Sequence, residues 1–376
     1  MRGTQPQTIR SLNLVSALDL VRRRTSISRA ELARELRLSP PTSSELVSVL
    51  LQSGLVVEHG PGESQGGRKP MMIEFSPTLG HVLGVDIGSE RIVFAIADLN
   101  GAIESETVIA TPNAHDDILM SIQDTGRTLI DSVSGPVIGA GIGVPGYCNR
   151  ALGRVIWASN LPGWTDLDLG PLLQRQWACP VVIDNDANLA ARGEMAYGAA
   201  GDYRNFVFVA LGRGVGAGVV IDQTIYRGRR EMAGEIGTWN LAQPWQATLE
   251  GVVGGIQWKS LAQELVGIPD VGLLFRGFRD GRQDIQDAVQ ERVGALCVTL
   301  GNIVALLDPE ALIFGGGLTA AWDVIGPLVE QALADTAFQV PIVVSTLPQR
   351  ATVVGALADA LESFAQSRHL LAGVDN

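Results

Sequence analysis

The chain has 376 residues and a mass of 39.8 kDa, more than one ordinary domain uses, so the length predicts two or three domains. Hydrophobic residues make up 46% of the chain and charged residues 18%, which excludes a disordered or fibrous protein. The first thirty residues lack the apolar block of a signal peptide, and no apolar run reaches the roughly 18 residues of a membrane span. We therefore predict a cytoplasmic protein without a membrane partner.

Charge is unevenly distributed along the chain. Residues 1–80 carry ten Arg or Lys residues against seven acidic residues, a local charge of +3. The rest of the chain holds 18 basic and 33 acidic residues, so that a net charge of −12 conceals a strongly acidic body. A basic N-terminal module on an acidic body is typical of a regulator bound to DNA, although an excess of three charges is small.

The first eighty residues predict a winged helix-turn-helix domain. Leu14, Leu18 and Val21 have the spacing of one face of a first helix. Ser28 stands three residues before Glu31, the spacing of a capping box, in which each residue satisfies a backbone N–H of the other. That box predicts a short second helix of about two turns, as expected of a positioning helix.

The third helix and a hairpin complete this module. The helix begins at Ser39, with two prolines in its first turn, and runs towards Gly54. Two short strands over 54–59 and 69–75, joined by a loop rich in glycine, predict the wing. The expected DNA contacts come from the outward face of the third helix and from the wing: Thr42, Ser44, Glu45, Ser48, Arg68 and Lys69.

Two alternatives stay open for this module. Three helices and a hairpin also occur in small dimerisation domains. Glu45 lies on the exposed face of the predicted reading helix, where a basic residue is more common. Its carboxylate could accept a hydrogen bond from a cytosine amino group or point to solvent.

From residue 81 the pattern changes to alternating strands and helices. Apolar strands over 81–88 and 91–98 and a turn at Asn100–Gly101 form one hairpin unit, and a similar unit recurs about 120 residues later, over 206–222. Two like lobes built on an α/β pattern predict a ligand cleft between them. Short apolar strands alternate with helices that we predict over 114–133, 187–198, 283–306, 320–336 and 350–366.

Eight short strings occur in order along this body: GVDIG, GIGVPG, ASNLPGW, VIDNDANLAARGE, LGRGVGAGVVI, AGEIG, LDPEALIFGGGL and VVGALADA. Together they resemble the ROK family, whose members are repressors, open reading frames and sugar kinases. SRAELARELRLS and GLVVEHGPGESQGGRKP resemble the DNA-binding part of its repressor branch, which includes xylose- and N-acetylglucosamine-responsive repressors. The resemblance implies an α/β, bilobal, actin- and hexokinase-like (ribonuclease H-like) body behind the winged helix.

The resemblance also implies a division of the chain. We expect a winged helix-turn-helix DNA-binding domain over 1–79. Lobe I of the body is expected over 80–190 and 352–376, and lobe II over 191–351, with the ligand cleft between them. Family members form homodimers or homotetramers, which is our expectation for this chain.

On the sugar side of the site, most residues that the ROK resemblance implies for sugar binding are present in this chain. Asp186 matches the kinase catalytic base, and Asn185 matches a residue that holds sugar hydroxyls. Without the resemblance, an Asn-Asp pair after a strand would be interpreted as a turn and helix cap. The implied ligand-binding set is Asn160, Asn185, Asp186, Glu235, Thr238 and Glu250.

Thr238 departs from the family pattern. Members with an intact metal site have a histidine there, followed by a cysteine-rich zinc loop, whereas residues 238–251 contain neither histidine nor cysteine. Structural zinc needs about four nitrogen or sulfur ligands, so no metal is expected. Trp239 and Trp245 are expected to pack this loop, or to stack on a sugar face.

The phosphate side departs further. ROK kinases carry a DxGGTK-like first loop and a GTG-like second loop. Glu90 here places a negative charge where a triphosphate would lie, and Arg213 places a long cation in the second loop. Either Arg91 or Arg213 could pair with Glu90 and close the phosphate site. We therefore expect no ATP and no other cofactor, and interpret these residues as degenerate phosphate loops: Asp86, Gly88, Glu90, Gly212, Arg213 and Gly214.

Three functions are compatible with these observations. The favoured one is a sugar-responsive repressor of carbohydrate genes that binds operator DNA and senses a monosaccharide or sugar phosphate without phosphorylating it. An active ATP-dependent sugar kinase with a regulatory DNA-binding arm is the enzyme alternative. A DNA-binding regulator with a vestigial sugar pocket is the third.

Overall fold

The structure of the chain is a computed structural model. The described residues are 13, 14, 16–18, 20, 21, 24, 26–52, 54–61, 70–76, 80–158, 160–242, 244–334, 339–347 and 349–372. Arg68 and Lys69, the two predicted wing contacts, lie outside them.

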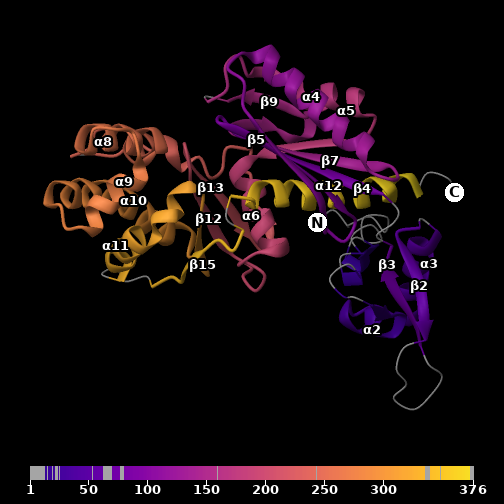
Figure 1. Ribbon diagram of the computed structural model, residues 1–376. Helices are drawn as coiled ribbons and strands as arrows, with labels where there is room; N and C mark the ends of the chain where they lie inside the picture. Colours follow the sequence, from indigo (N-terminus) through magenta and orange to yellow (C-terminus); the bar gives the residue numbers. More distant parts are fainter. Residues whose placement is uncertain are drawn as a thin grey trace.

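The N-terminal module is a winged helix-turn-helix, as predicted (Figure 1). All the described residues between 13 and 21 are helical. The wing is an antiparallel sheet in the order β1-β3-β2, to which the sequence analysis had assigned only two strands. The further elements of the module are β1 (Ile27–Ser28), α2 (Arg29–Glu35), α3 (Pro40–Gln52), β2 (Val56–Pro61) and β3 (Met71–Phe75).

The predicted capping box starts α2. The Ser28 hydroxyl accepts a hydrogen bond from the Glu31 backbone N–H at 3.2 Å, and the Ser28 N–H donates to the Glu31 carboxylate at 2.9 Å. Two orphan donors at the helix start are thereby satisfied. The buried Ser43 hydroxyl donates to the Arg29 carbonyl at 2.9 Å and fixes α3 against α2.

The body contains two five-stranded sheets with one topology. In each, three consecutive strands form an antiparallel meander, and two later strands add in parallel beside the first strand. This repeat confirms the predicted α/β body of two similar lobes. The lobe I order is β11 (Val181–Asn185), β7 (Val137–Val144), β4 (His81–Ile87), β5 (Arg91–Asp98) and β6 (Ile103–Ala110). The lobe II order is β14 (Thr224–Ile225), β13 (Val215–Ile221), β12 (Phe206–Leu211), β15 (Ala311–Gly315) and β16 (Ile342–Val344).

Helices cover these sheets (Figure 1). On lobe I, α4 (His115–Ser132) and α5 (Leu169–Trp177) lie on one face and α12 (Ala351–Ala372) on the other. A small sheet of β8 (Tyr147–Asn149), β9 (Arg154–Trp157) and β10 (Thr165–Leu167) borders that lobe. Lobe II carries α7 (Leu249–Val253), α8 (Gly255–Val266), α9 (Val271–Arg279), α10 (Gln283–Leu307) and α11 (Trp322–Ala334), with short 3₁₀ turns at Arg150–Leu152, Ile236–Thr238 and Gly317–Ala321.

Among the described helices, α10 also has the length and apolar composition of a membrane span. Such a helix is weak support for a membrane protein, because a core helix passes the same test. Here α10 packs against α11, α7 and α9, and its residues form part of the lobe II core.

Two helices join the lobes. α6 (Asp186–Tyr197) packs against β12 and β13 of lobe II, whereas α12 packs against β4 and β7 of lobe I. The two helices contact each other closely, because Gly193 of α6 faces the backbone of α12 and Gly355 of α12 faces the backbone of α6. A Cβ at Gly355 would overlap the Leu189 carbonyl, and one at Gly193 the Ala351 carbonyl. This crossing places the first turn of α6 between the two sheets.

The winged-helix module rests on α12 (Figure 1). Its buried side chains, including Leu14, Leu18 and Phe75, form one continuous hydrophobic cluster with Leu357 and Leu361 of α12. The DNA-binding module is thus packed directly on the helix that joins the two lobes.

Candidate functional site

The turn between β11 and α6 carries Asn185 and Asp186. The Asn185 Oδ1 accepts from the backbone N–H of Ala187 at 2.8 Å and of Asn188 at 3.2 Å, so Asn185 is the N-cap of α6. Its Nδ2 donates to the Gly146 carbonyl at 3.2 Å. Protein contacts thus engage both ends of this side chain, as the helix-cap alternative predicted, and a sugar contact from Asn185 stays a prediction.

Four carboxyl groups surround the first turn of α6. Burial, with a smaller contribution from the charge of Glu250 and against hydrogen bonds from backbone N–H groups, raises the pKa of Asp186 to about 6. Burial and then the charge of Asp186 raise the pKa of Asp86 to about 7, although Arg91 opposes the shift. Burial, Asp186 and Glu250 raise the pKa of Glu235 to about 7. Acids so close together can accept hydrogen bonds from a ligand rich in hydroxyl groups.

Asn160 and Glu250 meet at Gly214. A Cβ on Gly214 would lie 2.5 Å from the Glu250 Oε2 and 3.8 Å from the Asn160 Nδ2. The Glu250 Oε2 also accepts from the Val215 backbone N–H at 3.0 Å, which fixes this carboxylate. The structure therefore brings Asn160, Asp186, Glu235 and Glu250 of the predicted set into one site, which we call the acidic site.

Thr238, another member of the predicted ligand-binding set, is not among the residues brought together in the acidic site. Its side chain is exposed, and its hydroxyl donates to the Glu235 carbonyl at 2.8 Å within a 3₁₀ turn. Trp239 and Trp245 are half-buried and pack against the lobe II core, which agrees with the packing role expected of them. Within the described ranges no group of three or more His, Cys, Asp or Glu side chains is arranged to hold a metal ion.

The phosphate side carries an ion pair that the sequence analysis assigned wrongly. The partner of Glu90 is Lys259, at 2.6 Å, and neither Arg91 nor Arg213. The reason is that α8 starts on the second phosphate loop, where the Gly255 N–H donates to the Arg213 carbonyl at 2.8 Å, and α8 extends Lys259 towards lobe I. The hydrogen bond from Lys259 lowers the pKa of Glu90, with smaller contributions from Arg213 and Arg91.

This ion pair joins the first phosphate loop, in lobe I, to a helix of lobe II. Both side chains are about half exposed, so the pair contributes little to stability. Its position matters more than its strength.

The predicted DNA face lies on α3. Ser44, Glu45 and Ser48 are exposed there, as a reading face requires. Thr42 is half-buried, and its hydroxyl forms a hydrogen bond with the Ser39 hydroxyl at 2.7 Å at the helix start. Sequence reasoning missed Arg37, which is exposed in the turn between α2 and α3.

A second feature that sequence reasoning missed is a buried ion-pair network. One oxygen of the buried Asp184 carboxylate contacts the turn between β11 and α6, where it accepts from Asn185 N at 2.8 Å and from Asn188 Nδ2 at 3.1 Å. Its other oxygen accepts from Arg227 at 2.5 Å and from Arg150 at 3.5 Å. Arg227 follows β14 of lobe II, so the network crosses between the lobes.

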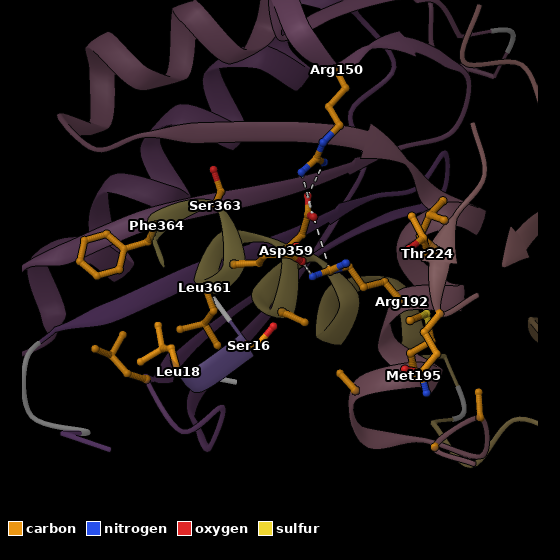
Figure 2. A pocket seen from close by; sticks show the side chains of 18 of the residues that line it. Ser16, Leu18, Arg150, Arg192, Met195, Thr224, Asp359, Leu361, Ser363 and Phe364 are labelled. Atoms are coloured by element: carbon orange, nitrogen blue, oxygen red, sulfur yellow. Dashed lines mark hydrogen bonds and ion pairs between the residues drawn. The ribbon is translucent and has the colours of Figure 1, made fainter. Parts of the chain in front are cut away.

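The network continues to α12 (Figure 2). Arg150 donates two hydrogen bonds to the buried Asp359, at 2.5 and 2.9 Å, and Arg192 of α6 approaches the same carboxylate at 3.5 Å. Arg192 also pairs with Glu362. The residues come from distant parts of the chain, so no local pattern could have predicted their pairing.

These side chains border a cavity of about 440 Å³ between the winged-helix module and the body (Figure 2). Leu18 and Phe75 line it from the module, Met195 from α6, and Leu361 and Phe364 from α12. This cavity is separate from the acidic site. The contact between the module and the body is therefore incompletely packed at this place.

Comparison with known proteins agrees with this architecture. The chain is 25% identical over 381 residues to the xylose repressor of Caldicellulosiruptor bescii, covering 93% of this chain and 95% of that protein. It is 29% identical over 307 residues to a glucokinase of Halalkalibacterium halodurans, covering 73% of this chain and 92% of the enzyme.

Among solved structures, a ROK family transcriptional regulator described as a homolog of the E. coli Mlc protein superposes with a TM-score of 0.83. The two are 21% identical, and the match covers 97% of this chain and 98% of the other. This likeness extends the shared fold through the N-terminal module. The model of the ROK family matches residues 82–362, most of the chain, so this protein belongs to the ROK family.

Proposed function

We propose that this protein is a cytoplasmic transcriptional repressor of carbohydrate genes that senses a sugar without phosphorylating it. The winged helix binds operator DNA through α3 and the wing. The acidic site binds the sugar, and xylose is the first effector to test because relatives aligned over the whole chain are xylose repressors. Operator binding by a homodimer is part of the proposal.

One observation carries the proposal: the sugar side and the phosphate side of the body differ. Asn160, Asp186, Glu235 and Glu250 converge, which supports binding of hydroxyl groups. The first phosphate loop is instead linked to α8 of lobe II by the ion pair between Glu90 and Lys259. A body that binds a sugar but admits no triphosphate suits a sensor better than a kinase.

The ion-pair network offers a route from the sugar to the DNA-binding module. Arg227 and Glu231 of lobe II contact Asp184 and the Arg150 backbone N–H of lobe I, at 2.5 and 2.7 Å. Closure of the lobes on a sugar would therefore move Arg150. Arg150 holds Asp359 on α12, and α12 supports the module. If the sugar binds the closed arrangement of the lobes more tightly than the open one, sugar binding favours the closed arrangement and thereby changes operator affinity.

The test is binding to fluorescent DNA from the upstream region of the protein's own gene, at fixed salt, with and without xylose, other monosaccharides and their phosphates. We expect sequence-selective binding that one sugar changes about tenfold or more. Asp186→Asn should abolish the sugar response and leave operator affinity unchanged. Binding that ignores every sugar would instead support a regulator with a vestigial pocket, and absence of selective binding would contradict the repressor.

An active sugar kinase is the second candidate, because Asp186 is present and glucokinases are among the relatives. A coupled assay of ATP consumption with the same sugars decides between them. We expect no turnover, since the Glu90 carboxylate and its ion pair oppose a triphosphate. Sugar-dependent ATP consumption that Asp186→Asn removes would establish the kinase.

A further inference from the structure

A partly exposed aromatic pair lies on the small sheet of lobe I. Tyr147 of β8 and Trp157 of β9 are cross-strand partners, and their rings stack with centroids 5.7 Å apart and planes 21° apart. Trp157 remains 46% exposed. A large indole held flat by a neighbouring ring and open to solvent presents a rigid apolar face, which is how proteins bind planar or ring-shaped ligands.

The pair adjoins the acidic site. Gly146 lies between them: a Cβ there would overlap the Trp157 carbonyl, and the Gly146 carbonyl accepts the hydrogen bond from Asn185. Tyr147 lies within the electrostatic influence of the same acids: burial, and then the charges of Glu235 and Glu250, raise the pKa of its phenol. The aromatic face is therefore continuous with the carboxylates that would hold a sugar.

We propose that Tyr147 and Trp157 form a second carbohydrate subsite, so that the effector is an oligosaccharide or glycoside with its terminal sugar in the acidic site and its next ring on the aromatic pair. This inference rests on the proposed sugar-sensing function. A pyranose ring has an apolar face of C–H groups that stacks on an indole, while its hydroxyl groups point sideways to polar partners. The Tyr147 hydroxyl and nearby carboxylates supply such partners.

Continuity with the acidic site selects this occupant over a protein. A protein interface would need an apolar patch that spreads away from the cleft residues. Ile156, the neighbour of Trp157 on β9, is also exposed, at 40%, but successive residues of a strand point to opposite faces. It therefore supplies a matched control on the other side of the same strand.

The experiment is calorimetric titration of the full-length protein with xylose and xylobiose, and with glucose and cellobiose. We expect the disaccharide of the preferred sugar to bind about tenfold more tightly than the monosaccharide. Trp157→Ala should remove this advantage and change monosaccharide affinity less than about twofold. Ile156→Ala should change neither affinity.

Each other outcome has a defined meaning. Equal affinity for mono- and disaccharides, or equal losses for both in Trp157→Ala, overturns the subsite and leaves sugar sensing intact. A change in oligomeric mass of Trp157→Ala by light scattering, with sugar affinities unaltered, makes the face a contact between copies of the chain and also overturns it. Failure of every sugar to bind overturns the sensing function and the subsite together. If Trp157→Ala does not fold, Trp157→Phe, which keeps a smaller ring, should retain part of the disaccharide advantage.

Discussion

Asp86, Asp186 and Glu235 carry pKa values raised from 3.8 or 4.5 to about 6 or 7. Between the ordinary and the raised pKa the folded protein binds more protons than the unfolded chain. The free energy of unfolding therefore falls as the pH rises through that window. A sugar hydroxyl that donates to Asp186 or Glu235 favours the ionised form of that carboxyl group, so sugar binding should release protons.

From this linkage we predict that sugar affinity rises about tenfold between about pH 5 and about pH 8 and then levels off. In Glu235→Gln the rise should shrink to about threefold, since one titrating acceptor is lost. Calorimetry in buffers of different ionisation enthalpy measures the released protons directly. Affinity that is constant over this range would show that the ligand does not contact the titrating acids.

Arg37 occupies a position that favours glycine. It has a φ of 53° and follows α2 in a Schellman motif, in which Leu38 N–H donates to Ala33 O at 2.8 Å and Arg37 N–H to Arg34 O at 3.2 Å. A side chain in this left-handed conformation costs about 1 kcal/mol relative to glycine. The exposed guanidinium next to α3 is well placed to contact a DNA phosphate.

We therefore predict opposite effects of Arg37→Gly on stability and function. The free energy of unfolding should rise by about 1 kcal/mol, measured by denaturant titration. Operator affinity should fall for all DNA sequences, and the slope of log affinity against log salt should decrease by about one. Arg29→Gln provides the comparison, because Arg29 already pairs with Glu58 at 2.8 Å and should affect DNA binding less. Unchanged affinity in Arg37→Gly would remove this residue from the DNA interface.

At the scale of elements, the crossing of α6 and α12 depends on the absence of side chains at the contact. Gly355→Ala would push a Cβ into the Leu189 carbonyl, and both helices would have to separate. We predict a loss of about 3 kcal/mol in the free energy of unfolding, because overpacking a close backbone contact strains the whole interface. Thermal and denaturant unfolding of the wild type and of Gly355→Ala measure this difference in the free energy of unfolding.

Gly301 of α10 offers the matched control for that substitution. It lies inside a helix, and a Cβ there would meet no atom within 4 Å. Gly301→Ala should raise the free energy of unfolding by about 0.5 to 1 kcal/mol, through the helix propensity of alanine alone. Equal effects of the two substitutions would mean that helix propensity, and not the crossing, decides the outcome at Gly355.

The elements that the sequence predicted well are those with strong local signals. The Ser28 capping box starts α2 where expected, and the periodic helix predicted over 283–306 is observed at Gln283–Leu307. β1 has only two residues, and α9 has nine with an internal Gly277, too short for a periodic pattern to be decisive. Those elements depend on tertiary contacts.

The site residues also fall into those with a local sequence signal and those whose partners depend on the tertiary fold. Acids in recognisable strings, such as Asp186 and Glu235, could be named from the resemblance, and the structure brings them close together, while their contact with a sugar stays a prediction. The partner of Glu90 was wrong because Lys259 is 169 residues away and reaches it only through the placement of α8. Asp359, which the network depends on, lies 209 residues from Arg150 and carries no local signal.

For the molecule as a whole, the ion-pair network ends on α12, the helix on which the winged-helix module is packed. If lobe closure on a sugar changes DNA binding, we expect the change to pass through α12. Asp359 is the junction, since it binds Arg150 from the sugar side and Arg192 beside the cavity under the module. We predict that Asp359→Asn uncouples the two sites. Operator affinity and sugar affinity should each stay within about threefold of wild type, while the sugar-induced change in operator affinity falls from about tenfold to less than about twofold.

Asp359→Asn should also lower the free energy of unfolding by about 3 kcal/mol, because it leaves buried arginine charge less compensated. This loss of stability must be distinguished from a loss of coupling between sugar binding and operator binding. Asp323 accepts two hydrogen bonds from Arg279 at 2.7 Å on the exposed surface of lobe II, so Asp323→Asn removes an ion pair away from the network at little cost in stability and should leave coupling intact. Operator binding measured with and without sugar, well below the melting temperature of each variant, gives the comparison. A full sugar response in Asp359→Asn would show that the signal reaches the module by another path, through the packing of α6 on α12 alone.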